Sequence, residues 1–131
     1  MAVSPGSLAY ASADDESARA AIACQVALQR HAGGDALIGR RLFPLLHEAE
    51  WSDITVTPRV VYVDGSRPEL ADSFTRRTFT AMISGVREPA VAAGLIDPRT
   101  FDSGIAALRR TAEPDGVFCY TFFKAVAQRR A

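Results

Sequence analysis

The sequence predicts an α+β fold in which four to five helices accompany few strands. Over most of the chain, apolar residues recur at the three- and four-residue spacing of amphipathic helices. Two segments, 53–64 and 117–123, are instead rich in β-branched or aromatic residues, which favours strands. A chain of 131 residues has the length of one domain. We therefore expect one domain with two good strands.

The N-terminal part is predicted to contain an irregular lead-in and a long helix. Residues 1–13 are mostly small and include one proline and one glycine, which favours irregular structure. Ser12–Glu16 places a capping residue before carboxylates, as at a helix start. Apolar residues then recur at helical spacing until Gly33–Gly34 ends the helix.

A second helical stripe covers residues 35–48. Pro44 is tolerated in the first turn of a helix but not in its interior. The regular part is therefore expected to begin near Arg41, with a disturbed backbone around Gly39.

The first predicted strand, 53–64, contains Pro58. Proline has no N–H to donate to a neighbouring strand, so Pro58 predicts an edge strand or a bulge. Helices follow over 66–112: Ser66–Glu69 has the S-x-x-E pattern of a capping box, and Asp97–Pro98 opens a further helix.

The final strand begins after a turn signal at Glu113–Gly116. Val117–Phe123 is apolar or aromatic at nearly every position, so this strand is predicted to lie inside a sheet and to be covered on both faces. Two strands alone form no stable sheet. We therefore expect the strand to need neighbours beyond those that the sequence predicts.

Composition excludes several classes of function. The 15 basic residues balance the 15 acidic ones, which argues against nucleic-acid binding as the main role. Cys24 and Cys119 stand far apart without paired histidines, so we expect apolar packing for both and no metal site. No apolar run approaches the roughly 20 residues of a membrane span, and no signal peptide is recognisable, so a cytoplasmic location is expected. The arginine- and alanine-rich composition is typical of a GC-rich bacterial source.

A family resemblance becomes visible at Ile38–Leu42, continued by Leu45–Leu46 and Glu48–Trp51. This stretch resembles the helix that closes the nucleotide-binding sheet of class I S-adenosylmethionine-dependent methyltransferases. Residues 54–63 are similar to the penultimate strand that follows in the family. Residues 74–108 resemble the helical insertion that small-molecule methyltransferases carry over the active site, and Gly116–Lys124 resembles the reversed last strand.

The resemblance extends from about residue 7 to the C-terminus and divides the chain, as one partial domain over 1–131, into four segments. They are an irregular lead-in (1–13), closing helices with the penultimate strand (14–64), a helical insertion or lid (66–112) and the final strand (117–127). The fold implied is the C-terminal part of a Rossmann-like α/β methyltransferase. Where the family usually has a glycine, this chain has Glu50, although glycine suits a left-handed helix terminus better.

The cofactor of the family is S-adenosylmethionine, which the family holds with a glycine-rich turn after its first strand. This chain has no G-x-G-x-G, and Gly33–Gly34 follows a predicted helix rather than a strand. We therefore expect it to bind no donor and to transfer no methyl group alone. Its expected partner is a missing N-terminal half or a second copy of itself.

The candidate substrate-pocket residues are Arg40, Tyr62, Phe74, Phe79 and Met82. An arginine could bind an acidic substrate, although surface charge at a helix start is the commoner role. The two phenylalanines and Met82 could line a pocket under the helical insertion or belong to the core. Tyr62 could direct its hydroxyl to a pocket or pack in the sheet.

His31 and His47 are the two candidates for a catalytic base. His31 is better explained as a helix-end residue and His47 as a solvated residue, so no catalytic base is assigned. Two alternatives to an enzyme fragment stay open. One is a non-enzymatic interaction or dimerisation module that pairs through an exposed sheet edge. The other is a self-contained α+β ligand-binding domain, which requires four or more strands. The sequence leaves the substrate and the methyl-accepting atom undefined.

Overall fold

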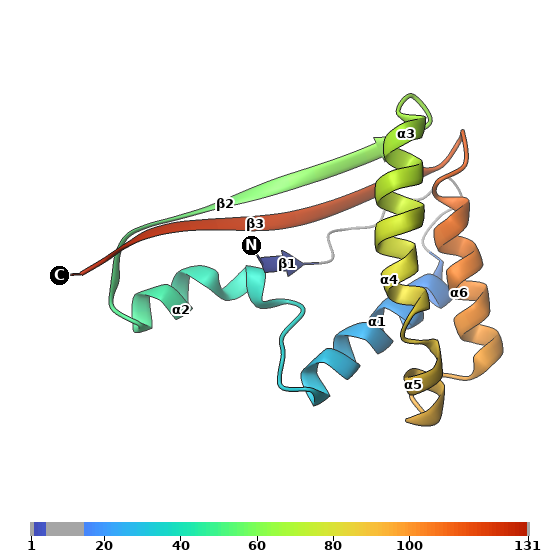
Figure 1. The fold of residues 1–131 in the computed structure, drawn as a ribbon, viewed down its shortest axis with the longest axis horizontal. Coiled ribbons are helices and arrows are strands. Elements are labelled where there is room, and N and C mark those ends of the chain that lie inside the picture. The colour runs from blue at the N-terminus through green and yellow to red at the C-terminus, as the bar shows by residue number, and fades with distance from the viewer. Residues whose placement is uncertain (1, 5–14, 131) are drawn as a thin grey trace.

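A computed structural model describes residues 2–4 and 15–130, and the architecture is a mixture of helices and strands. Figure 1 shows a long ribbon of two strands with a short third strand beside it, and most of the helices packed at one end of this ribbon. The elements, in chain order, are β1 (Ala2–Ser4), α1 (Glu16–His31), the 3-10 helix η1 (Ile38–Arg41), α2 (Leu42–Glu48), β2 (Trp51–Asp64), α3 (Pro68–Leu70), the π-helix η2 (Ala71–Thr80), α4 (Ala81–Ser84), α5 (Arg87–Ala92), α6 (Pro98–Arg110) and β3 (Val117–Arg129).

The sheet of the described residues has the order β1-β3-β2, and β3 runs antiparallel to both of its neighbours. The two outer strands therefore run in the same direction, and the last strand of the chain is the reversed one. The predicted position of β3 inside a sheet is confirmed. Its pairing with β2 is long, from Val117 opposite Asp64 to Arg129 opposite Trp51, whereas β1 pairs with residues 121–123 alone.

The sequence predicted two good strands, and the sheet of the described residues has three. Ala2–Ser4, assigned from the sequence to the irregular lead-in, forms β1. A three-residue strand is too short to show a periodic pattern, and here the open edge of β3 provides the hydrogen-bond partners that fix it. The rest of that lead-in, residues 5–13, lies outside the described residues.

Pro58 predicted an edge strand or a bulge, and β2 is an edge strand of the described sheet. Pro58 lies opposite Phe123, and no strand of the described sheet lies on the outer side of β2, so the proline interrupts no pairing with a further strand. A register shift lies between Ser52 and Thr55, where Asp53 adopts a φ of 50°. The bulge therefore occurs near the start of the strand rather than at the proline.

Helix starts differ from the predicted caps in two places. The side chain of Asp15 caps α1 by accepting a hydrogen bond from the Ala18 amide at 2.9 Å, while the predicted cap Ser12 lies outside the described residues. The capping box at Ser66 was wrong: its hydroxyl donates to Asp64, and the residue before α3, Arg67, makes no side-chain cap bond. A carboxylate two residues upstream competes for the serine. Asp97 caps α6, as predicted.

Glu50 lies directly after α2 and adopts a φ of 61°, in the left-handed region. This conformation brings the Cβ atom close to the backbone and costs a non-glycine residue about 1 kcal/mol. The departure from glycine noted in the sequence thus falls at a position where glycine is favoured.

Replacing Glu50 with glycine is expected to raise the free energy of unfolding by about 1 kcal/mol, because the left-handed strain is relieved. Urea denaturation followed by circular dichroism measures the change. Glu48→Gly is the matched control, since Glu48 lies in the last turn of α2 and glycine there should cost up to about 1 kcal/mol. An E50G variant no more stable than the parent would contradict the strain.

The segment α3-η2-α4 forms one continuous helical rod whose middle part has π winding (Figure 1). In an α-helix, residues five apart point about 140° away from each other around the axis. The i to i+5 repeat of a π-helix aligns them instead. Phe74 and Phe79 both contact the rings of Phe118 and Tyr120, with centroid separations of 4.9–6.0 Å.

The helices α1 and α6 cross at close range at the far side of the core. Gly104 of α6 is buried, and a Cβ atom added there would lie 2.3 Å from the Ser17 carbonyl oxygen of α1. A glycine at this position therefore sets how near the two helix backbones come. Phe101 and Leu108 on the same side of α6 are completely buried.

The two faces of the sheet differ at the end near the helices. Phe118 and Tyr120 share the face covered by the π-helical rod and are buried. On the opposite face, Val60 is 64% exposed and Tyr62 is 50% exposed. On this face Val117, Cys119 and Thr121 of β3 are half-buried, so within the described residues β3 is fully covered only on the side of the rod, and the prediction of cover on both faces is met on one face alone.

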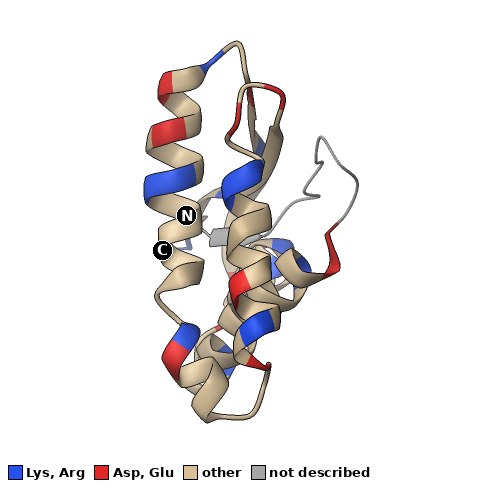
Figure 2. Cartoon of the chain, turned by 90° about the vertical axis from the view of Figure 1, so that its right-hand side faces the viewer, with Lys and Arg blue, Asp and Glu red and all other residues tan. Residues whose placement is uncertain are grey.

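Charge is distributed evenly over the helices. Figure 2 shows basic and acidic residues interspersed along them. Arg87 and Asp102 form a two-pronged ion pair between α5 and α6, with N–O distances of 2.7 and 2.9 Å. Within the described residues, no helix has the length and apolar character needed to cross a membrane.

Candidate functional site

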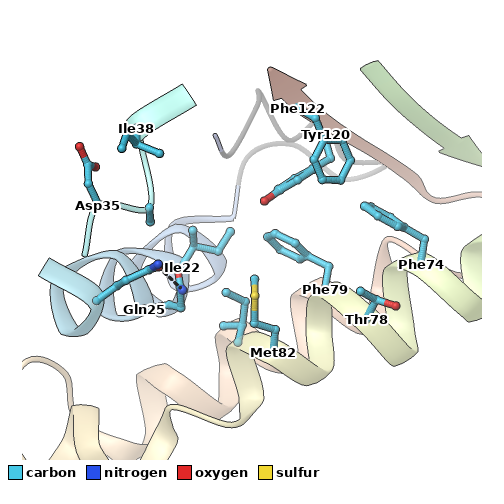
Figure 3. A pocket seen from close by; sticks show the side chains of 13 residues that line it. Ile22, Gln25, Asp35, Ile38, Phe74, Thr78, Phe79, Met82, Tyr120 and Phe122 are labelled. Carbon is cyan, nitrogen blue, oxygen red and sulfur yellow. Dashed lines mark hydrogen bonds between the residues drawn. The ribbon is translucent and has the colours of Figure 1, made fainter. Parts of the chain in front are cut away.

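A cavity of about 390 Å³ lies between the π-helical rod, α1 and the middle of β3. Figure 3 shows side chains from all three elements directed toward this space, whereas the carboxylate of Asp35, in the loop that follows α1, points away from it. The volume is in the range that binds small organic molecules in proteins. The described lining residues are Ile22, Gln25, Gln29, Asp35, Ala36, Ile38, Phe74, Thr78, Phe79, Met82, Ile83, Tyr120 and Phe122.

One wall of the cavity is aromatic. The ring of Tyr120 lies 5.8 Å from Phe74, 5.1 Å from Phe79 and 4.9 Å from Phe122, each in an edge-to-face arrangement. Such contacts hold rings in fixed orientations and add to the stability gained by burial. The wall is therefore formed before any ligand arrives.

The facing wall carries the polar groups. The Gln25 amide nitrogen donates to the Gln29 side-chain oxygen at 2.9 Å, one turn along α1. Asp35 follows in the loop, where its carboxylate accepts from the Leu37 amide at 2.9 Å and from Arg41 at 3.4 Å. Asp35 is the one charged side chain among the described lining residues. The cavity thus pairs an apolar, aromatic side with a hydrogen-bonding side.

Tyr120 is the polar group of the aromatic wall. It is 4% exposed, and its hydroxyl points into the cavity toward α1 (Figure 3). It makes no hydrogen bond to any residue in the described part of the chain. Burial raises the pKa of Tyr120 to about 12, because the phenolate would lose its hydration. The phenol is therefore neutral at physiological pH, and its hydrogen is free to be donated.

The structure brings together three of the five candidate pocket residues. Phe74, Phe79 and Met82 line the cavity, so the first two serve both the core and the pocket. Arg40 lies on η1, is exposed and is not a lining residue. Tyr62 is opposite Cys119 in the sheet, on the face away from the cavity. Neither of these two residues belongs to the site.

Sequence reasoning missed the contributions of α1 and β3 to the pocket. A signal for β3 was present: Phe118, Tyr120 and Phe122 alternate along the strand and so share one face. For α1, Gln25 and Gln29 are four residues apart and therefore share one side of the helix. Nothing in the sequence indicated that these two surfaces face each other.

The histidines and cysteines lie outside the cavity lining. His31 and His47 are exposed at the ends of α1 and α2, and His47 stacks on Phe43 with ring centroids 6.1 Å apart. Cys24 is buried and Cys119 is half-buried, and both are free thiols. Over residues 2–4 and 15–130, no three His, Cys, Asp or Glu side chains are grouped so that they could hold a metal ion.

The described residues do not fit the methyl donor implied by the family resemblance. Gly33–Gly34 follows the helix α1 and not the carboxyl end of a strand. The family resemblance also implies an acidic residue at a strand end that accepts hydrogen bonds from the ribose hydroxyls of the donor. Asp64 does end a strand, but its carboxylate already accepts hydrogen bonds from the amide and hydroxyl of Ser66. What the arrangement offers is a preformed pocket for a small molecule. No protein-family model matches the chain, and no curated protein matches its sequence.

Proposed function

We propose that this chain forms the C-terminal cap and closing strands of a class I S-adenosylmethionine-dependent methyltransferase that acts on a small molecule. The chain supplies the pocket for the methyl acceptor, and a further α/β unit supplies the donor site. In the absence of that unit the chain is inactive.

The observation that carries this proposal is the direction of the three strands. The last strand, β3, is reversed between β1 and β2, which run in the same direction. A reversed last strand is what the resemblance of Gly116–Lys124 implies. The order of elements adds support, since α2 leads into β2 and a helical segment separates β2 from β3.

The position of the cavity gives the second line of support. The helical segment between β2 and β3 contributes Phe74, Phe79 and Met82 to the lining, as expected of an insertion that lies over a substrate. Methyl transfer from a sulfonium depends largely on positioning the acceptor. Rigid aromatic walls and a fixed hydrogen-bond donor are suited to that task, because they orient a flat molecule and keep water away.

Isothermal titration calorimetry with S-adenosylmethionine tests the proposal. We expect no measurable binding to the isolated chain, because it has no glycine-rich turn after a strand. Saturable binding is expected once the chain is co-purified with the polypeptide encoded directly upstream of it. Tight donor binding by the isolated chain would contradict the division of roles. An upstream polypeptide that co-purifies and still gives no donor binding would contradict the family assignment.

A second candidate function is an interaction or dimerisation module, and the partial cover of β3 favours it. Within the described residues, β1 pairs with residues 121–123, whereas β3 extends over Val117–Arg129. Among the described residues, the rest of this edge has unpaired backbone groups that a strand of another chain can pair with. The outer edge of β2 likewise has no neighbouring strand in the described sheet, and Val60 and Tyr62 of β2 are exposed beside it.

Sedimentation equilibrium distinguishes the second candidate from the first. A module that pairs with itself should form a dimer at micromolar concentration without any other polypeptide. Val60→Lys should weaken that dimer, and Val126→Lys is its control, because Val126 is 56% exposed on the other face of the sheet. A monomer at high concentration would contradict self-association.

A further inference from the structure

We infer that the cavity binds a flat, uncharged aromatic molecule with a carbonyl oxygen on one edge, facing Tyr120, and a hydrogen-bond donor on the opposite edge. This inference deepens the proposed function, since such a molecule would be the methyl acceptor. The binding it describes depends on the pocket of this chain alone.

The shape of the ligand follows from the walls. Phe74, Phe79 and Phe122 surround Tyr120 in fixed edge-to-face contacts, and Ile22 and Ile83 contribute apolar surface. Aromatic rings present large, rigid surfaces that pack best on other flat rings. The cavity of about 390 Å³ has room for a small fused-ring compound.

The carbonyl oxygen of the ligand is inferred from the position of Tyr120. Its hydroxyl is directed into the cavity, has no partner among the described residues and belongs to a side chain that is 4% exposed (Figure 3). This hydroxyl opens into the cavity among apolar rings, where a hydrogen bond to a ligand oxygen is stronger than in bulk water, so a ligand oxygen that accepts its hydrogen is favoured. A phenolate oxygen on the ligand would bring a charge, for which the described lining residues offer no cation.

The hydrogen-bond donor of the ligand and its lack of charge are inferred from the wall that faces Tyr120. Gln25 and Gln29 line this wall, and the Gln29 side-chain oxygen, which accepts from Gln25, keeps a second lone pair for an N–H donor of the ligand. Asp35, the one charged residue of the described lining, is an anion that is already paired with Arg41 and the Leu37 amide, so an anionic ligand finds no partner at this wall. Arg41 contacts Asp35 at 3.4 Å from outside the cavity and is not a lining residue, so it supplies no site for an acid.

Three related probes test these requirements on the isolated chain by fluorescence titration. 4-Quinolone has a carbonyl and an opposite N–H, chromone has the carbonyl without the N–H, and naphthalene has neither. We expect 4-quinolone to bind most tightly and naphthalene most weakly, with each hydrogen bond contributing about a factor of ten or less in Kd. Equal affinity for all three, or tightest binding of naphthalene, would overturn the inference.

Single substitutions distinguish the loss of the Tyr120 hydrogen bond from a loss of folding. Tyr120→Phe is expected to weaken 4-quinolone about tenfold and to leave naphthalene unchanged. Tyr62→Phe, on the opposite face of the sheet, should change neither. Met82→Trp replaces a residue that is 44% exposed at the cavity, so it should fill the space without unfolding the chain and should reduce the binding of every probe. A loss in Tyr120→Phe that is equal for 4-quinolone and naphthalene would assign the hydroxyl a structural role and contradict the inference.

The two proposals fail separately. If the isolated chain binds 4-quinolone but its complex with the upstream polypeptide binds no S-adenosylmethionine, the methyltransferase proposal is refuted and the proposed ligand class is retained. Donor binding by a complex that takes up none of the three probes would refute the ligand class and retain the methyltransferase.

Discussion

Replacing Phe118 with alanine is expected to lower the free energy of unfolding by about 4 kcal/mol. Phe118 is completely buried in a ring cluster formed with Phe74, Phe79 and Tyr120. Its ring lies 4.9 Å from Phe79 and 6.0 Å from Phe74, so truncation removes the contacts of this strand residue to the π-helical rod. A rigid helix on one side and a hydrogen-bonded strand on the other cannot collapse into the space. Chemical denaturation monitored by circular dichroism measures the loss.

Phe43→Ala is the matched control for the same truncation at the surface. Phe43 is 53% exposed on α2, and its replacement should cost under about 1 kcal/mol. Similar losses in F118A and F43A would show that the ring cluster does not hold the rod on the sheet.

Replacing Gly104 with alanine is expected to cost about 3 kcal/mol, the second large effect. The added Cβ atom would lie 2.3 Å from the Ser17 carbonyl oxygen and 3.0 Å from the Cβ atom of Ala21. Backbone atoms of α1 cannot rotate away as a flexible side chain can. The two helices must therefore separate, and the contacts around Phe101 are weakened. A fall in the thermal midpoint reports this change.

Gly85→Ala provides the comparison for Gly104. Gly85 has a right-handed φ of −65°, and an added Cβ atom there would lie 3.5 Å from its nearest neighbours, which is ordinary contact. Because alanine restricts the unfolded chain, G85A should leave stability unchanged or raise it by up to about 1 kcal/mol. A G104A variant as stable as G85A would contradict the close helix crossing.

The parts of the fold that sequence reasoning predicted well are those with a strong local cause. Pro58 predicted the edge strand because proline cannot donate a hydrogen bond. Gly39 and Pro44 predicted the disturbed start of the second helix, which is the 3-10 segment Ile38–Arg41 followed by Leu42–Glu48. Local backbone chemistry was sufficient in both cases.

The π winding could not be predicted, because no residue type specifies it. Treating Phe74 and Phe79 as part of a regular α-helix places them on different sides, although both contact Tyr120. Thr75 and Thr80 are likewise five apart and buried, and their hydroxyls have no hydrogen-bond partner. The packing of two aromatic rings onto one strand thus outweighs the local preference.

Of the candidate site, the helical wall was predicted from the sequence and the other walls were not. Its helical wall was found because apolar residues at helical spacing mark a face that is either core or pocket, and here Phe79 is both. The contribution of Tyr120 and Gln25 depends on contacts between elements that are distant in the sequence. A local sequence pattern does not show contacts of this kind.

The topology of the sheet has a consequence for synthesis on the ribosome. β2 ends at Asp64 and its partner β3 begins at Val117, so the pairing must wait for residues 65–116 to be made. Closing a segment of this length carries an entropic cost that slows folding relative to a local hairpin. Until the last strand emerges, β2 lacks the one partner that it has in the described sheet, and an unpaired strand edge of this kind is prone to aggregate during synthesis.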